Sequence, residues 1–153
     1  MRLSVLAVGH MRNTPEAPLY DTYAKRIAQT GRRVSLDGLH LSEIKEQANA
    51  NAKLLAHLDT HKDALLVALD ETGEDMSSRA LAQKIADWRD DGTREVTFIL
   101  GAADGLNDAI RQKATVTLSL GRMTWPHMLA RLLLAEQIYR SISILSGHPY
   151  HRD

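Results

Sequence analysis

Short apolar runs rich in β-branched residues alternate along this chain with longer stretches whose apolar residues recur at helical spacing. The short runs predict strands buried on both faces, and the longer stretches predict helices that connect them. The predicted strands cover residues 3–8, 34–39, 64–69, 96–100 and 116–120; the predicted helices cover about 14–31, 42–58, 78–89 and 126–145, with a short helix after Asn107. This order is typical of an α/β fold in which helices flank a mostly parallel sheet.

Capping residues and apolar stripes define the first two predicted helices. Thr14 and Pro15 are typical of a helix start, Gly31 can end that helix, and Ser42 is the expected cap of the next. The expected stripes are Leu19, Tyr20, Tyr23 and Ile27 in the first helix, and Ile44, Ala48, Ala52, Leu55 and Leu58 in the second. These faces should pack on the sheet.

The last predicted helix is apolar on more than one side. Its apolar residues are Met128, Leu129, Leu132, Leu133, Leu134, Ala135, Ile138, Ile142 and Leu145. A helix that is apolar over so wide an arc is usually buried on two sides. In a chain of this size the second side can belong to another copy, so the pattern predicts a homodimer.

Length and composition favour one domain over residues 1–153, because 153 residues can bury a core without covalent links. The absence of cysteine excludes disulfide bonds, thiolate zinc sites and a cysteine nucleophile. Charged residues interrupt the most apolar stretch, residues 129–145, so no membrane span is expected. The first apolar run is too short for a secretory signal, and we expect a cytoplasmic protein.

The charges are balanced overall but unevenly distributed. Up to Asp108 there are 17 acidic and 13 basic residues, whereas from Ala109 onward there are 2 acidic and 6 basic residues. A basic segment in a neutral protein favours a local contact with a polyanion. The alternative is that these charges are simply solvated.

The glycine-rich loop at residues 101–105 follows a predicted strand and would let a ligand approach the backbone closely. It lacks the G-x-G-x-x-G spacing and the later acidic residue of a dinucleotide site. There is no P-loop, and His57 and His61 lack the glutamate and third ligand of a zinc site. No metal site is therefore expected.

The chain ends in an unusual tail, residues 148–153, directly after the most apolar helix. It contains His148, Tyr150, His151 and Arg152. Imidazole, phenol and guanidinium groups bind phosphate, stack on bases and move protons. The tail is therefore a candidate catalytic or nucleic-acid-binding segment; the alternative is a polar end without function.

Several segments in order resemble a known family. They are Ala7–Gly9, Leu69–Asp70, Phe98–Leu106, Leu118–His127, Arg131, Ala135–Arg140 and the tail from His148. With these motifs, nearly the whole chain resembles the ribosomal RNA large subunit methyltransferase H family of the SPOUT superfamily. The chain departs from it at Ala102, where the family usually has glycine; close approach should survive unless this residue needs a positive φ.

The resemblance implies a C-terminal trefoil knot, a homodimer, and methylation of N3 of a pseudouridine in 23S rRNA within the assembled ribosome. It also implies S-adenosylmethionine as the methyl donor. The implied donor pocket consists of Leu69, Gly101, Leu120, Gly121, Arg122, Met123, Thr124 and Trp125. Strand ends and loops of this kind offer backbone groups and apolar walls to a ligand.

Methyl transfer to an imide nitrogen mainly requires positioning and loss of one proton, which costs roughly 3 kcal/mol at neutral pH. A modest base or a nearby positive charge suffices. The catalytic candidates are His148, Tyr150, His151 and Arg152. Arg131 and Arg152 are the candidate contacts to RNA phosphate.

Two other functions are compatible with the residues. A different transferase or nucleotide-binding enzyme can use the same α/β layout, and tight NAD binding would favour it. A ribosome-binding module without catalysis would bind ribosomal particles and transfer no methyl group.

Overall fold

Five parallel strands form one sheet in the order β2-β1-β4-β3-β5 in a computed structural model, which describes residues 1–151. The strands are β1 (Arg2–Val8), β2 (Asp37–Ile44), β3 (Leu65–Asp75), β4 (Glu95–Leu100) and β5 (Val116–Ser119). The α/β class expected from the sequence is confirmed. Arg152, an expected catalytic and RNA-contacting residue, lies outside the described residues.

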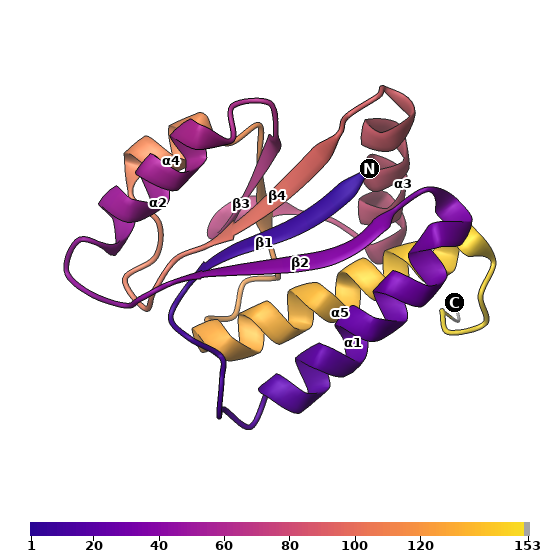
Figure 1. The fold of residues 1–153 in the computed structure, drawn as a ribbon, viewed down its shortest axis with the longest axis horizontal. Helices are drawn as coiled ribbons and strands as arrows, with labels where there is room; N and C mark the ends of the chain where they lie inside the picture. Colours follow the sequence, from indigo (N-terminus) through magenta and orange to yellow (C-terminus); the bar gives the residue numbers. More distant parts are fainter. Residues whose placement is uncertain (152–153) are drawn as a thin grey trace.

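The helices cover both faces of the sheet (Figure 1). They are α1 (Ala17–Gly31), η1 (Arg32–Val34), α2 (Ala50–Thr60), α3 (Ser78–Asp90), α4 (Asp108–Lys113) and α5 (His127–Ser146). Among residues 1–151, no helix is both long enough and apolar enough to span a membrane. As expected, Asn107 caps α4, its side chain accepting from the backbone N–H of Ile110 at 3.0 Å.

Alternate residues of the strands fill two separate cores. Val5 in β1 packs with α1, α3 and α5, whereas its neighbour Leu6 packs with α2 and α4. Both faces of the parallel sheet are therefore buried, which explains why β1, β4 and the start of β3 are nearly continuous apolar runs rather than alternating ones.

The expected boundary between the second strand and the second helix is wrong. β2 begins at Asp37 and continues to Ile44, so Ser42 lies in the strand rather than at a helix cap. Helix α2 begins only at Ala50, and its buried face is Ala50, Leu54 and Leu58. Pairing with β1 along its whole length stabilises the longer strand, and this pairing outweighs the helical spacing of the local sequence.

Two further expectations are corrected. Helix α1 begins at Ala17 rather than near Thr14, and Leu19 is 48% exposed instead of facing the core. β3 does not end in a turn at residue 70. Its pairing with β5 breaks after Leu69 and resumes at Glu74, because residues 70–73 bulge around β5.

Helix α5 lies between α1 and α3 and packs against the sheet (Figure 1). Its own chain therefore covers much of the wide apolar arc, including Leu134, Ile138 and Ile142. Met128, Leu129, Leu132 and Leu133 are only half-buried. The two-sided pattern is thus explained largely within one chain, and a narrower apolar strip remains at the surface.

Candidate functional site

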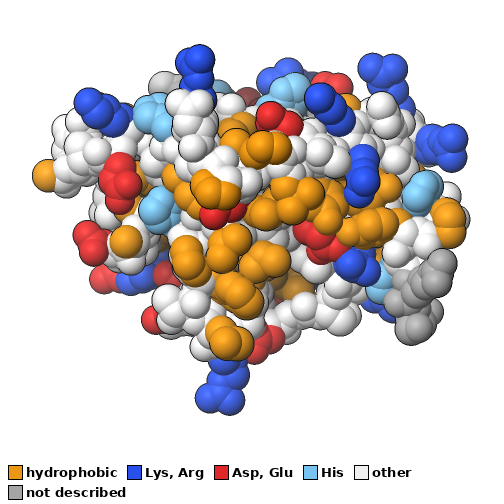
Figure 2. Space-filling model, turned by 90° about the horizontal axis from the view of Figure 1, so that it is seen from below, with side chains coloured by type: hydrophobic (Ala, Val, Ile, Leu, Met, Phe, Trp, Pro, Cys, Tyr) orange, Lys and Arg blue, Asp and Glu red, His pale blue; other side chains and the backbone are white. Residues whose placement is uncertain are grey.

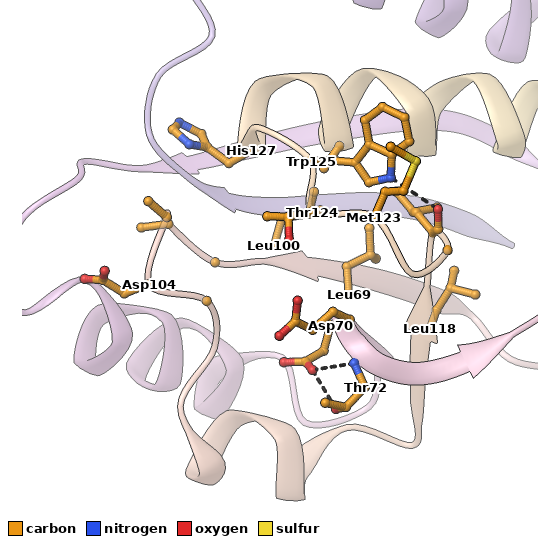
Figure 3. A pocket seen from close by; sticks show the side chains of 18 of the residues that line it. Leu69, Asp70, Thr72, Leu100, Asp104, Leu118, Met123, Thr124, Trp125 and His127 are labelled. Carbon is orange, nitrogen blue, oxygen red and sulfur yellow. Dashed lines mark hydrogen bonds between the residues drawn. The ribbon is translucent and has the colours of Figure 1, made fainter.

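The carboxyl ends of β3, β4 and β5 surround a cleft of about 440 Å³. Its walls are the bulge at residues 70–73, the loop after β4, the segment after β5 and the start of α5 (Figure 3). Open α/β sheets usually bind their ligands at this edge, where successive loops converge. We call this space the donor cleft.

Most of the residues expected to bind a methyl donor lie around this cleft. Leu69, Gly101, Leu120, Gly121, Met123, Thr124 and Trp125 line it. Arg122, which is exposed, is not among the lining residues. Segments that are up to 56 residues apart in sequence, from Leu69 to Trp125, therefore meet at one site.

Backbone packing, rather than side chains, shapes the floor of the donor cleft. A Cβ on Gly101 would lie 2.6 Å from the carbonyl carbon and oxygen of Gly105, so no larger residue fits. Ala102 accepts a hydrogen bond from the N–H of Gly105 at 2.9 Å, and its φ is not positive. The departure from the family at Ala102 is therefore accommodated without strain.

One side-chain cluster joins two of the loops. Asp70 accepts hydrogen bonds from the N–H and hydroxyl of Thr72, at 3.0 and 2.6 Å (Figure 3). It also accepts from Arg111 Nη1 at 3.0 Å. Arg111 also donates to the Leu106 carbonyl at 2.7 Å and pairs with Asp108. Partial burial opposes the charged form of Asp70, but these hydrogen bonds outweigh it and hold its pKa below the usual value.

The cleft is also lined by residues that were not expected from the sequence to bind the donor: Asp70, Thr72, Arg111 and His127. Asp70 belongs to a segment that resembles the family, Leu69–Asp70, but no binding role was expected for it. Arg111 had no sequence signal, because its link to Asp70 spans 41 residues.

The segment between β5 and α5 forms the most exposed wall. Met123 and Trp125 are 71% and 39% exposed, although both are large and hydrophobic. The indole N–H of Trp125 donates to the Leu120 carbonyl at 3.3 Å (Figure 3). Gly121 has a φ of 101°, which favours glycine. Exposed apolar side chains beside a cleft are typical of a ligand-binding surface.

None of the described tail residues lines the donor cleft. The tail packs against the C-terminal half of α5, where the Tyr150 hydroxyl donates to Glu136 at 3.0 Å and lies 3.2 Å from the Tyr23 hydroxyl. His151 Nδ1 lies 3.4 Å from Arg140, and His148 is exposed. Arg140 is ten residues beyond the cleft residue Ala130, or about 15 Å along the helix.

Hydrogen bonds and ring contacts hold Tyr150, and they favour the protonated form of its phenol. Burial raises the pKa of its phenol, and hydrogen bonds with Tyr23 and Glu136 raise it further. Its ring centroid lies 4.6 Å from that of Tyr139, and the Arg140 guanidinium lies 5.0 Å from its own. Tyr150 therefore anchors the tail and remains protonated near neutral pH.

Arg131 is buried and does not reach the solvent. It is 1% exposed, and its guanidinium donates to Glu43 at 2.6 Å and to the carbonyls of Val8 and Gly9 at 2.9 and 3.1 Å. Its expected contact with RNA phosphate is corrected: Arg131 joins α5 to the ends of β1 and β2. A buried guanidinium requires such partners because desolvation is costly.

Glu43, the partner of Arg131, also accepts from the N–H of Met11 at 2.7 Å. Partial burial favours its neutral form, but the hydrogen bonds and the Arg131 charge outweigh this and lower its pKa. Within residues 1–151, no cluster of His, Cys, Asp or Glu could hold a metal ion. The donor cleft instead combines apolar walls, backbone groups and three carboxylates, from Asp70, Glu71 and Asp104.

Comparison with known proteins places these features in a family context. The family model described as "Predicted SPOUT methyltransferase" matches residues 1–151. The chain is 43% identical to ribosomal RNA large subunit methyltransferase H of Agrobacterium fabrum, over 99% of both chains. It is 45% identical to the protein of the same name from Paracoccus denitrificans, over 100% of both chains.

Solved structures share the fold at low sequence identity. A tRNA (m1G37) methyltransferase from Aquifex aeolicus superposes with a TM-score of 0.58 at 11% identity, over 99% of this chain and 73% of that one. A probable methyltransferase from Bordetella pertussis superposes with a TM-score of 0.56 at 15% identity, over 92% and 96%. These likenesses concern the fold alone.

Proposed function

Because the chain belongs to the SPOUT methyltransferase family, we propose that it methylates N3 of a pseudouridine in 23S rRNA, using S-adenosylmethionine. The substrate is the assembled ribosome, since a single domain of this size has little surface for recognising RNA alone. The enzyme therefore works in the cytoplasm. The observation that carries the proposal is the donor cleft, in which seven of the residues expected from the family motifs meet.

The residues of the donor cleft fit such a donor. Gly101 packs directly against the backbone of Gly105, which holds the loop after β4 close to the end of its strand. Leu69, Leu118 and Leu120 provide apolar walls. Arg111 pairs with Asp70, and the carboxylates of Glu71 and Asp104 give the cleft an acidic side that favours a cation. S-adenosylmethionine, when bound, supplies a methyl group on a positively charged sulfonium.

The chain's own contribution is to hold both reactants and exclude water. Asp70 and Arg111 fix two of the cleft loops relative to each other, so the donor is oriented by walls that do not move independently. The acceptor nitrogen must lose its proton, and the imidazoles and Arg152 of the tail are the proposed groups that favour the anion. Tyr150 is proposed as their anchor.

We further propose that two copies pair through α1 and α5. Figure 2 shows hydrophobic side chains gathered across the middle of this face, with lysines and arginines around its margins. The residues are the exposed Leu19 and the half-buried Met128, Leu129, Leu132 and Leu133. Twofold pairing with antiparallel α5 helices would bring the partner's tail to the N-terminal end of α5, beside the donor cleft. This arrangement reconciles a catalytic tail with its distance from the cleft in one chain.

The proposed trefoil knot is supported by the close crossing of β3 and β5. A Cβ on Gly73 would lie 2.6 Å from the carbonyl carbon of Leu118, so the bulge of β3 wraps tightly around β5. In the proposed knot, the segment between β5 and α5 passes through the loop formed by the chain around the bulge of β3.

The test is incubation with S-adenosylmethionine labelled in its methyl group and with ribosomes from a strain that lacks the protein. We expect one labelled nucleotide in 23S rRNA, identified by mapping as N3-methylpseudouridine. Binding to ribosomes without transfer of label would favour a non-catalytic module. Tight binding of NAD, without binding of the methyl donor, would favour a different nucleotide-dependent enzyme.

A further inference from the structure

A second cavity, of about 620 Å³, lies beside the donor cleft. The two spaces adjoin at the end of β5 and along the segment between β5 and α5, since Leu118, Leu120, Gly121 and Trp125 line both. The other walls come from the end of β3, the start of α3 and the middle of α5. We call this space the second cavity. The residues of these other walls do not line the donor cleft.

The second cavity combines a flat apolar wall with a hydrogen-bonding amide. Trp125, 39% exposed, supplies the indole, and Leu81 adds apolar surface. Ser78 Oγ donates to Gln137 Oε1 at 2.7 Å, and Gln137 Nε2 donates to Glu136 at 2.8 Å. A carboxamide has two N–H donors and two lone pairs. In the part of the chain that the structure describes, Gln137 therefore keeps one donor and one acceptor position for a ligand.

These groups match the chemistry of a pyrimidine base. Its ring is flat and stacks on an aromatic side chain, and its edge carries carbonyl acceptors and N–H donors that complement a carboxamide. The position of the cavity also matches. A methyl acceptor must lie within about 3.5 Å of the transferred carbon, so it needs its own space directly beside the donor.

We infer that the second cavity receives the pyrimidine base that accepts the methyl group; this rests on the proposed methyl transfer. The base stacks on Trp125, and its carbonyl and N–H edge pairs with Gln137. In the reaction, the ring nitrogen forms a bond to the methyl carbon as the carbon–sulfur bond breaks. The sulfur leaves as a neutral thioether with that electron pair, and the proton of the ring nitrogen goes to water.

The same network joins the second cavity to the tail. Glu136 accepts from Gln137 through Oε2, and from Tyr150 and Arg140 through Oε1. A single carboxylate thus fixes both the amide that reads the base and the phenol that anchors the tail. Gln137 lines the second cavity but not the donor cleft, so replacing it should weaken binding of the base without weakening binding of the donor.

The test compares Gln137→Leu with Gln83→Leu. Gln83 is exposed on α3, bonds only to Asp87 at 2.8 Å among the described residues, and lines neither space, so the control makes the same chemical change elsewhere. Both variants are made in the protein and, separately, in a Trp88→Phe background, where Trp125 is the sole tryptophan. We measure methyl transfer to ribosomes, calorimetric binding of S-adenosylhomocysteine, and quenching of Trp125 fluorescence by uridine 5′-monophosphate with that product bound.

Gln137→Leu should lower kcat/KM for ribosomes and the affinity for the nucleotide by at least about tenfold. Binding of S-adenosylhomocysteine should change by less than about twofold, and Gln83→Leu should change nothing beyond that margin. Methylation by Gln137→Leu within about twofold of the unmodified protein, or nucleotide quenching that survives the change, would overturn the inference. If Gln137→Leu does not fold, Ser78→Val takes its place with the same expectations.

Failure of the proposed function gives a different result. In that case the unmodified protein itself transfers no methyl group and does not bind S-adenosylhomocysteine. When the unmodified protein methylates ribosomes and Gln137→Leu does so equally well, only the assignment of the second cavity fails.

Discussion

The two ends of α5 are built by different kinds of interaction. At its N-terminal end, the donor cleft is formed by close backbone packing, as at Gly101 and Gly73. At its C-terminal end, the tail is held by side-chain hydrogen bonds and rings around Glu136 and Tyr150. The cleft should therefore be sensitive to added volume, whereas the tail should be sensitive to the loss of individual polar groups. Binding of the donor and catalysis should then separate genetically.

Removing the tail should give the largest effect and the clearest separation. Without residues 148–153, we expect methyl transfer to ribosomes to fall by more than about 100-fold, since the groups proposed to favour the ionised base are lost. Binding of S-adenosylhomocysteine should persist, because no described tail residue lines the donor cleft. Calorimetry and labelled transfer are measured on the same preparation. Normal methylation by the shortened chain would show that the tail is not catalytic.

Gly101→Ala should have the next largest effect. It acts on the donor cleft, at the opposite end of α5 from the tail. The new Cβ would come within 2.6 Å of Gly105, so the loop must move, at a cost of about 1–3 kcal/mol. We expect affinity for S-adenosylhomocysteine to fall about tenfold to hundredfold by calorimetry. The control is Ala102→Gly, which removes a methyl group from the adjacent residue. Unchanged affinity in Gly101→Ala would mean that the backbone contact does not shape the donor site.

Asp70→Asn tests the side-chain cluster that joins two of the cleft loops. The substitution keeps the shape but removes the charge that pairs with Arg111, so donor affinity should fall by about threefold to tenfold. Asp108→Asn is the matched control, because Asp108 also pairs with Arg111 but has a side chain that is 82% exposed. Equal effects of the two changes on donor binding would argue against a special role for Asp70.

Tyr150→Phe should have a modest effect. It removes the hydrogen bond to Glu136, worth about 1 kcal/mol, and keeps the ring against Tyr139. Release of the tail residues by carboxypeptidase should accelerate about fivefold, while the pH profile of methyl transfer keeps its shape because the phenol is not the base. Loss of the basic limb of that profile would instead identify Tyr150 as a titrating catalytic group.

The smallest expected effect is a pH dependence of stability. It concerns Glu43, which lies in β2 and belongs to neither the donor cleft nor the tail. The pKa of Glu43 is lowered in the folded protein, so its pairing with Arg131 adds stability above its ordinary pKa of 4.5. That stability is lost as the pH falls below 4.5 through the folded value. Thermal unfolding between pH 7 and pH 3 should show a smaller decline in Glu43→Gln than in the unmodified protein. Parallel declines would contradict a pH role for this pair.

Local sequence predicted much of the fold and some of the site. The apolar runs gave all five strands, the Asn107 cap was confirmed, and the motif at residues 101–105 led to the donor cleft. Prediction from local sequence was wrong at β2, where Ser42 was expected to begin a helix. The strand continues there because it pairs with β1, whose residues lie some 35 positions away in the sequence. The prediction was wrong again at Arg131, whose burial depends on Glu43 and the end of β1.

By itself, the sequence determined the class of the fold, the absence of cysteine chemistry and the family motifs, since these depend on residue type and short-range spacing. Only the tertiary structure packed the described tail residues against α5 outside the donor cleft, turned Arg131 inward and opened a second cavity beside Trp125. Each of these depends on which distant segments pack together. A cavity or a buried charge is a property of several elements at once, and no local stretch of the chain encodes it.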